Sequence, residues 1–350
     1  MEQSDKGCRR AKFLLLAAIS LVHSGCYYMQ AASGQWQVMR KSEPIDEVIG
    51  KDGTSDELAA RLRLVQEARR FSVDELGLPD NESYRNYTDI EREFVVWNVF
   101  AAPEFSLQPK QWCFPIAGCV SYRGYFSHEA ALSKAERLAD EGYDVAVGGV
   151  SAYSTLGNFN DPVLSSMLRW DDIQLVGTLF HELAHQVLYV KGDTGFNESF
   201  ATAVEEIGLQ RWLESRSQSD DIERYWQRRD LRGELMALVA AARADLQDIF
   251  AKPINEDEKR QLKTNRLLRL REDVVSKLEQ AGRPASAWLS EDLNNARLAS
   301  MTLYEGWLPA FRSMFRQCRR DLPCFYTQSK EISELGMEAR EARLMALSRR

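Results

Sequence analysis

The chain has 350 residues, of which 44% are hydrophobic and 28% are charged, so it is long enough to bury a core as one large domain or two small ones. Its formal net charge is −7, and an acidic protein is a poor candidate for binding nucleic acid.

The first 25 residues have the pattern of an export signal. Arg9, Arg10 and Lys12 precede an apolar run from Phe13 to Val22, and a basic segment followed by a short apolar one is typical of a cleaved signal peptide. The run is too short to span a bilayer as a helix. Removal of residues 1–25 takes away four basic and two acidic residues, so the net charge of −7 becomes −9.

Cys26 follows Ser24 and Gly25 at the end of that signal. This stretch resembles the lipobox of bacterial lipoproteins, in which the cysteine is lipidated and becomes the new N-terminus. The resemblance implies that a lipid on Cys26 anchors the protein to a membrane. In Gram-negative lipoproteins an aspartate directly after the lipidated cysteine changes the membrane to which the protein is sorted. Tyr27 stands at that position, so the resemblance further implies an outer-membrane lipoprotein that faces the periplasm. A plain secretory signal is the alternative.

Four cysteines remain for the folded chain: Cys113, Cys119, Cys318 and Cys324. Export makes disulfides permissible. Five residues separate the members of each pair, so two local bridges are the simplest connectivity, although four cysteines allow three pairings. A thiolate zinc site is the competing interpretation, and the spacing matches no common zinc-finger pattern.

The first half of the mature chain is predicted to mix helices with a small sheet. Apolar residues recur at helical spacing from Asp56 to Leu78, which predicts an amphipathic helix. Aromatic and β-branched residues cluster between residues 93 and 154, and we expect a small sheet there. A helical segment from His128 to Glu141 interrupts it.

Beyond Asp161 the chain is predicted to be almost entirely helical. Residues 219–252 and 255–281 alternate both signs of charge, which favours a solvated helical hairpin, turned around Pro253 and Asn255. Further helices are expected over residues 292–350. The fold class is therefore α+β and predominantly helical, with residues 26–350 forming a single unit.

The segment 180-FHELAHQVLYVKGDTGFNESFATAVEEIG-208 contains the pattern of a metal site. His181 and His185 lie four apart in a predicted helix from Asp171 to Val190, so both imidazoles share one face and can chelate a single ion. Glu182 can then reach a water on that ion. The alternative is an ordinary pair of histidines on an amphipathic helix.

A catalytic zinc site needs a third protein ligand. His128 is the other histidine of the mature chain, but it opens a helix in a distant segment. A second helix, which we expect to start near Asn197 within the metal-site helices of residues 171–216, offers Glu198, Glu205 and Glu206. A glutamate from it would complete the two-histidine, one-glutamate set of zinc hydrolases.

HELAHQ followed by NESFATAVE resembles the zinc peptidases of the gluzincin type, and is closely similar to the motifs of aminopeptidase N, although the interval between the motifs is shorter here. Together with Cys26, the stretches 112-WCFPIAGCVSYRGYF-126 and 148-GGVSAYSTLGNFNDP-162 resemble a bacterial family of predicted lipoprotein aminopeptidases, and this resemblance spans most of the mature protein. It implies a zincin-like catalytic domain, one zinc ion, a peptide substrate and Glu198 as the third ligand.

Helix geometry leaves the third ligand open. If the first helix runs to Val190 and the second returns antiparallel from Asn197, the residue level with the two histidines is near Ala203, at about 1.5 Å rise per residue. Glu205 is closer to that level than Glu198 and is therefore a rival ligand. Because Glu198 and Glu205 share one face, one could bind the ion while the other orients a histidine. Glu206 points away from them, and we expect it to be solvated.

The predicted chemistry is metal-assisted hydrolysis of an amide. Zinc lowers the pKa of its bound water, and Glu182 can take the proton and pass it to the leaving amine. Gluzincins add a tyrosine or histidine that stabilises the oxyanion, and Tyr304 and Tyr153 are the candidates here. Residues 150–157 form either an edge strand that pairs with an extended peptide or an ordinary core strand.

An aminopeptidase must also bind the substrate's free ammonium group. Glu205, Glu206 and Asp161 are the candidates for that contact. Two other functions stay open, which are a zinc endopeptidase that acts on envelope proteins and a non-catalytic envelope lipoprotein that keeps the fold. Glu182 argues against the latter, because a structural zinc site needs no base.

Overall fold

The structure of the chain, a computed structural model, describes residues 27, 29–114, 118–152, 154–155, 157, 159–285, 293–302 and 306–349. The predicted export signal, Cys26, Tyr153 and Tyr304 lie outside the described residues.

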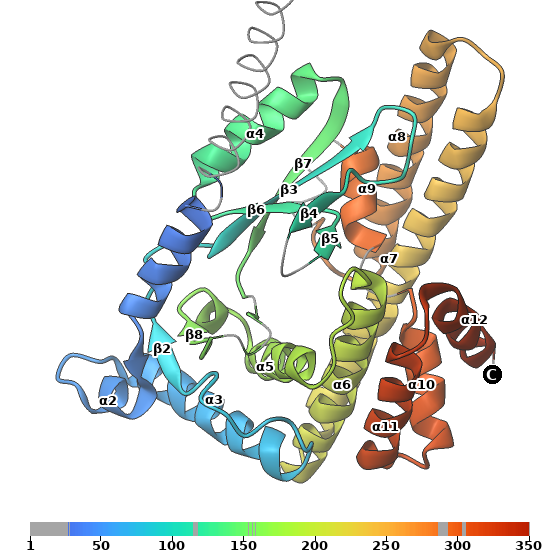
Figure 1. Cartoon of the computed structure of the whole chain (residues 1–350). Coiled ribbons are helices and arrows are strands. Elements are labelled where there is room, and N and C mark those ends of the chain that lie inside the picture. Colours follow the sequence, from blue (N-terminus) through green and yellow to red (C-terminus); the bar gives the residue numbers. More distant parts are fainter. Residues whose placement is uncertain are drawn as a thin grey trace, which may run out of the picture.

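Most of the described residues are helical (Figure 1). The helices are α2 (Ile45–Gly50), α3 (Asp56–Asp74), α4 (His128–Asp140), the 3-10 helix η1 (Met167–Arg169), α5 (Asp172–Val187), α6 (Thr194–Ser215), α7 (Ser219–Ala251), α8 (Glu256–Gln280), α9 (Asn295–Thr302), α10 (Leu308–Gln317), α11 (Leu322–Ser333) and α12 (Met337–Ser348). The strands are β1 (Glu43–Pro44), β2 (Asn86–Thr88), β3 (Val96–Pro103), β4 (Trp112–Phe114), β5 (Gly118–Val120), β6 (Arg123–Tyr125), β7 (Tyr143–Val150) and β8 (Val163–Leu164). Helices with small sheets make this an α+β fold.

The strand-rich region forms two sheets rather than the single small sheet that we predicted. β3 lies between β6 and β7 in an antiparallel sheet, and β4 pairs with β5 separately. Successive residues of a strand point to opposite faces. Val99 and Ala101 accordingly pack in a cluster with α4, whereas Phe100 and Ala102 pack with Ala296 of α9. Helices therefore cover both faces of β3 (Figure 1).

The main core lies below that sheet, where α5 and α6 pack against α3 and α10. Apolar side chains such as Phe180 and Phe200 are fully buried there. A second core holds α7 and α8 together as an antiparallel hairpin. Lys263 of α8 ties this hairpin to the sheet, since its Nζ donates to Asp144 Oδ2 at 2.6 Å. The hairpin is therefore packed along one side rather than fully solvated.

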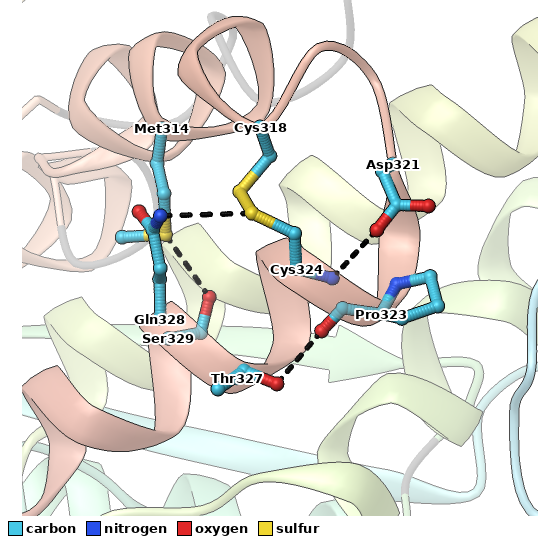
Figure 2. Close-up of a disulfide and its surroundings, with 8 residues drawn as sticks. All are labelled: Met314, Cys318, Asp321, Pro323, Cys324, Thr327, Gln328 and Ser329. Atoms are coloured by element: carbon cyan, nitrogen blue, oxygen red, sulfur yellow. Dashed lines mark hydrogen bonds between the residues drawn. A yellow bond between two sulfur atoms is a disulfide. The ribbon is translucent and has the colours of Figure 1, made fainter.

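Two local disulfides join neighbouring elements. Cys113 and Cys119 are bonded across the β4–β5 pair, where they are direct register partners. Cys318 and Cys324 are bonded across the turn from α10 to α11, as Figure 2 shows. In that turn the carboxylate of Asp321 accepts from the backbone N–H of Cys324 at 2.9 Å and caps α11 (Figure 2).

Within the described part of the chain, no helix has both the length and the apolar character needed to cross a membrane.

Candidate functional site

Helix α5 carries the two histidines on the face that borders a cleft. The helix starts where Asp171 caps it by accepting from the backbone N–H of Gln174 at 2.8 Å. It ends at Val187, because the backbone turns extended at Leu188. Thr178, His181, Glu182 and His185 line the cleft, at the spacing of one helical face.

The link from α5 to α6 is held by Asn197. Its Oδ1 accepts from the backbone N–H of Val190 at 2.7 Å, and its Nδ2 donates to the carbonyl of Val190 at 2.8 Å. Asp193 caps α6 by accepting from the N–H of Phe196 at 3.0 Å, so the helix begins at Thr194. Asn197, which we predicted near the start of this helix, lies one turn inside it and clamps the two helices together.

These helix ends decide which glutamate faces the histidines. We predicted that α5 would run to Val190 and that the next helix would begin near Asn197, and both bounds were wrong by three residues. At about 1.5 Å rise per residue, the corrected antiparallel pair moves the position level with the histidines from Ala203 back to Glu198.

The structure brings His181, His185 and Glu198 into one cluster. Glu198 Oε2 lies 3.2 Å from His181 Nε2, and Glu198 Oε1 lies 3.7 Å from His185 Nε2. One ligand atom from each of the three residues lies within 4.8 Å of the other two. Two imidazoles and a carboxylate at this separation form a candidate site for one divalent ion.

The electrostatics of the cluster favour a positive charge at its centre. Burial lowers the pKa of His185 to about 4, so its ring is neutral and offers a lone pair. Burial opposes ionisation of Glu198, but its bond to His181 and the charges of both histidines lower the pKa of that carboxyl. Burial also disfavours charge on His181, yet Glu198 and Glu205 raise its pKa well above the ordinary value. The cluster therefore attracts a positive charge, as a metal site should.

Glu205 contacts the opposite nitrogen of the first histidine. Its Oε2 lies 3.1 Å from His181 Nδ1. In this position the carboxylate can accept a hydrogen bond from the Nδ1–H group and so orient the ring with Nε2 towards Glu198. Among the described residues, the group that could hold one ion contains Glu198 and not Glu205, and the contact of Glu205 is with the other nitrogen of His181.

Glu182, next to His181 in the chain, has a carboxyl group with a raised pKa. The pKa of Glu182 is raised to about 7, mainly by burial and also by the charges of Glu198, Asp161 and Glu205, while His181 acts in the opposite direction. Its carboxyl also lines the cleft. A carboxyl that exchanges its proton near neutral pH can act as a base and then as an acid.

The cleft has a volume of about 940 Å³. Val150 and Ser151, which end β7 and follow it, form part of its wall, so the start of the stretch predicted as an edge or core strand borders the cleft. Phe114 of β4 and Val120 of β5 contribute a second wall. Gly118 of this hairpin has a φ of +78° and lies against the α5–α6 link, where a Cβ would meet Lys191 at 2.9 Å. The sheets and the link thus shape the entrance.

Two carboxylates that we considered for ammonium binding lie elsewhere. Glu206 was predicted to be solvated, and this was wrong: it is 3% exposed, and its carboxylate accepts from Arg229 of α7 and Arg312 of α10 at 2.6 to 2.9 Å. Two guanidiniums make burial of its charge tolerable. Asp161 is also buried, and its Oδ2 accepts from the N–H of Thr155. Neither residue lines the cleft as the structure describes it.

Four tyrosines that sequence analysis did not place at the site line the cleft: Tyr27, Tyr122, Tyr189 and Tyr225. Tyr189 lies four residues after His185, and this helical spacing could have indicated it. Tyr122 and Tyr225 come from a loop and from α7, and no local pattern links either to the histidines. His128 lies apart from the cleft, stacked on Trp97 with 3.8 Å between the ring centroids.

A protein family described as putative aminopeptidase matches residues 26–344 of this chain. The match includes the whole ligand cluster and the elements that form the cleft. A search of the curated proteins finds no similar protein, and a search of the solved structures finds no similar structure.

Proposed function

The chain belongs to the putative aminopeptidase family, and we propose that it is a zinc-dependent peptidase that removes N-terminal residues from peptides. The observation that carries the proposal is the cluster of His181, His185 and Glu198 beside the buried Glu182. Two imidazoles, one carboxylate and an adjacent base in a cleft are the parts that hydrolysis of an amide bond requires.

His181 Nε2, His185 Nε2 and Glu198 would hold the ion. When bound, zinc supplies a Lewis acid that polarises the substrate carbonyl and makes water a nucleophile at neutral pH. Two imidazoles with a carboxylate favour zinc over magnesium or calcium, which prefer sets of oxygen ligands. This donor set is the zincin-like, gluzincin-type arrangement that the HELAHQ and NESFA motifs imply.

Glu182 moves the proton in the proposed reaction. Its carboxylate takes a proton from the attacking water while the water oxygen forms a bond to the carbonyl carbon of the substrate. The same carboxyl then donates that proton to the amide nitrogen as the carbon–nitrogen bond breaks. A pKa of about 7 suits both halves of this cycle at neutral pH, because the group must be ionised first and protonated afterwards.

A hydroxyl donor would stabilise the oxyanion. Burial raises the pKa of both Tyr122 and Tyr189 above the ordinary value, with a further contribution from Glu198, so both hydroxyls stay protonated and able to donate. They join Tyr153 and Tyr304, which lie outside the described residues, as candidates for this role. For the substrate's ammonium group, Glu205 is the remaining candidate of the three carboxylates, because it lines the cleft.

We also propose that the enzyme is a lipoprotein, anchored through Cys26 in the outer membrane and facing the periplasm. The export pattern of residues 1–25 and the Ser-Gly-Cys sequence support this proposal. The two disulfides fit an oxidising compartment. Mass spectrometry of the N-terminal peptide from the membrane fraction tests it, and an unmodified Cys26 or a retained residue 25 would refute it.

Replacement of the proposed base tests the activity itself. Glu182→Gln should lower kcat for aminoacyl substrates by roughly 100-fold or more, the usual contribution of a general acid–base group, while the bound zinc remains. Metal content by atomic absorption and hydrolysis of free and N-blocked substrates are the measurements. Glu214→Gln, at the exposed end of α6, is the matched control. Absence of metal, or unchanged activity in Glu182→Gln, would contradict the mechanism.

A further inference from the structure

Asn98 is a polar residue at the centre of an apolar strand. It lies in β3, within the stretch 94-FVVWNVFA-101, and asparagine is depleted in strands. The residue is 8% exposed. Together with Val96, which shares its face of the sheet, it borders the cleft. Packing within the sheet therefore does not explain an asparagine at this position.

The carboxamide of Asn98 is available to a ligand. No described residue forms a hydrogen bond with its oxygen or its nitrogen, although buried polar groups nearly always have a partner. A carboxamide offers both an acceptor and donors. Because this side chain borders the cleft, a molecule bound in the cleft can supply the missing hydrogen bonds.

Glycines on both neighbouring strands keep the space around this carboxamide open. Gly124 of β6 and Gly148 of β7 are the direct register partners of Asn98, since β3 lies between those two strands (Figure 1). A Cβ at Gly124 would lie 3.2 Å from Asn98 Oδ1 and would crowd it. At Gly148 no atom of the described residues lies within 4 Å of the place that a Cβ would take. The main chain of a ligand can therefore approach Asn98.

Asn98 lies a short distance from the ligand cluster. Phe100 follows it by two residues on the same face of β3, which is about 7 Å along the strand. The ring of Tyr122 lies beside that of Phe100, with 5.8 Å between the centroids. Burial raises the pKa of Tyr122, and the charges of Glu198 and Glu182 raise it further, so Tyr122 is near both carboxylates. Because an extended peptide covers about 3.3 to 3.6 Å per residue, a few residues of substrate connect the cluster to Asn98.

The surroundings of Asn98 favour a peptide group over an ammonium group as its ligand. A peptide group presents one donor and one acceptor, which match the acceptor and the donors of a carboxamide. An ammonium group has donors only and needs a negative charge when it is buried. The nearest neighbours of Asn98 on this face are instead apolar, because Val96 and Val150 are the next pair in register and both line the cleft.

We propose that Asn98 binds the main chain of the peptide substrate, with its oxygen accepting from a peptide N–H and its nitrogen donating to a peptide carbonyl. This inference rests on the proposed function and names a residue that holds its substrate. When an N-terminal residue is removed, all other peptide groups lie on the leaving side of the cleaved bond. Asn98 therefore binds the second or third peptide group, and substrates of three or more residues are preferred to dipeptides.

Replacement of single peptide groups by esters tests the proposal apart from catalysis. Calorimetry on the full chain carrying Glu182→Gln, loaded with zinc, compares tetra-alanine with two analogues in which the second or the third amide is an ester and lacks its N–H. One ester should bind at least about threefold more weakly than tetra-alanine, as loss of one hydrogen bond allows. Asn98→Val, added to Glu182→Gln, should remove this difference.

The same variant separates a binding role from a structural one. A carboxamide without hydrogen-bond partners does not stabilise the fold, and valine is well suited to a strand. The melting temperature of Asn98→Val should therefore stay the same or rise. Asn294→Ala is the matched control, because the nitrogen of Asn294 donates to the carbonyl of Val145 in the same sheet at 2.8 Å. It should lower the melting temperature and preserve the difference between amide and ester.

The outcomes separate the two proposals. Equal binding of tetra-alanine and both esters, or an unchanged difference in Asn98→Val, would overturn the main-chain site. A melting temperature lowered as much as in Asn294→Ala would assign a structural role to Asn98 and overturn it as well. If acetylation of the N-terminus, rather than either ester, loses its effect in Asn98→Val, the residue binds the ammonium group and the proposal is wrong. If unsubstituted enzyme hydrolyses no peptide while the ester difference is present, the main-chain site stands and the proposed peptidase activity fails.

Discussion

Two glutamates on one face of α6 contact different nitrogens of the same histidine. Glu198 lies at His181 Nε2 and also near His185, whereas Glu205 lies at His181 Nδ1. The first carboxylate can share an ion with both imidazoles, and the second can fix the tautomer of one ring. At the scale of single residues, this difference in atoms favours Glu198 as a ligand and Glu205 as an orienting group, although both side chains are glutamates.

Substitution of each glutamate should therefore affect metal binding unequally. Glu205→Gln is expected to weaken zinc affinity by about 10- to 100-fold, as loss of an orienting carboxylate does, and Glu198→Gln should weaken it further. Competition with a chromogenic chelator measures both affinities, and Glu214→Gln serves as the control. If Glu205→Gln lost more affinity than Glu198→Gln, the assignment of ligand and orienting group would have to be exchanged.

At the scale of elements, the link between α5 and α6 determines which residue of α6 faces the histidines. Its six residues join an extended end of α5 to a capped start of α6. Asn197 bonds to both the N–H and the carbonyl of Val190, so the register of the two helices depends on one side chain. Glu198 follows Asn197 directly, which couples the clamp to the metal site.

Removal of this clamp should disturb both stability and metal binding. Asn197→Ala leaves the partly buried N–H and carbonyl of Val190 without their partner and is expected to lower the free energy of unfolding by about 1 to 3 kcal/mol. It should also weaken zinc affinity. Urea unfolding and chelator competition provide the two measurements.

Asn255→Ala is a matched control, because Asn255 caps α8 far from the cluster. It should cost about 1 kcal/mol through loss of the cap and leave zinc affinity unchanged. Equal zinc affinity in Asn197→Ala and the unsubstituted protein would show that the register does not depend on the clamp.

At the scale of the whole molecule, the cleft is assembled from segments that are distant in sequence. The β3–β7 sheet, the β4–β5 pair, the α5–α6 pair and one face of α7 all contribute to it. The ligand cluster itself joins α5 to α6, and those helices belong to the main core. Bound metal should consequently stabilise the folded state as a whole, since the unfolded chain lacks the site.

Chelation should lower the melting temperature of the loaded protein. A ligand present at 100 times its dissociation constant contributes about 2.7 kcal/mol, which corresponds to a shift of several degrees in a protein of this size. Differential scanning calorimetry with and without EDTA measures this shift. A variant with both His181→Ala and His185→Ala should show no response to EDTA, and an equal response in that variant would point to metal bound at another place.

The predictions from sequence differ most from the structure at the ends of α5 and α6, where the two helices face each other. The positions of His181, Glu182 and His185 on one face follow from the helical period alone, and the same period predicted α3 and the charged helices of the hairpin. The third ligand was ambiguous, because a change of three residues at two helix ends moves the facing position from Ala203 to Glu198. The resemblance of NESFA to known motifs favoured Glu198 where idealised geometry did not.

The sequence by itself determined that His181, Glu182 and His185 share one face, since two histidines and a glutamate within five residues depend only on the geometry of one helix. Tertiary structure decided what surrounds that chemistry. It buried Glu206 between two arginines, placed Glu205 on the far nitrogen of His181, and brought Tyr225 with its neighbouring arginines to the cleft. These outcomes depend on contacts between residues that are far apart in the chain, and a local periodicity contains no information about which distant helix covers a given face.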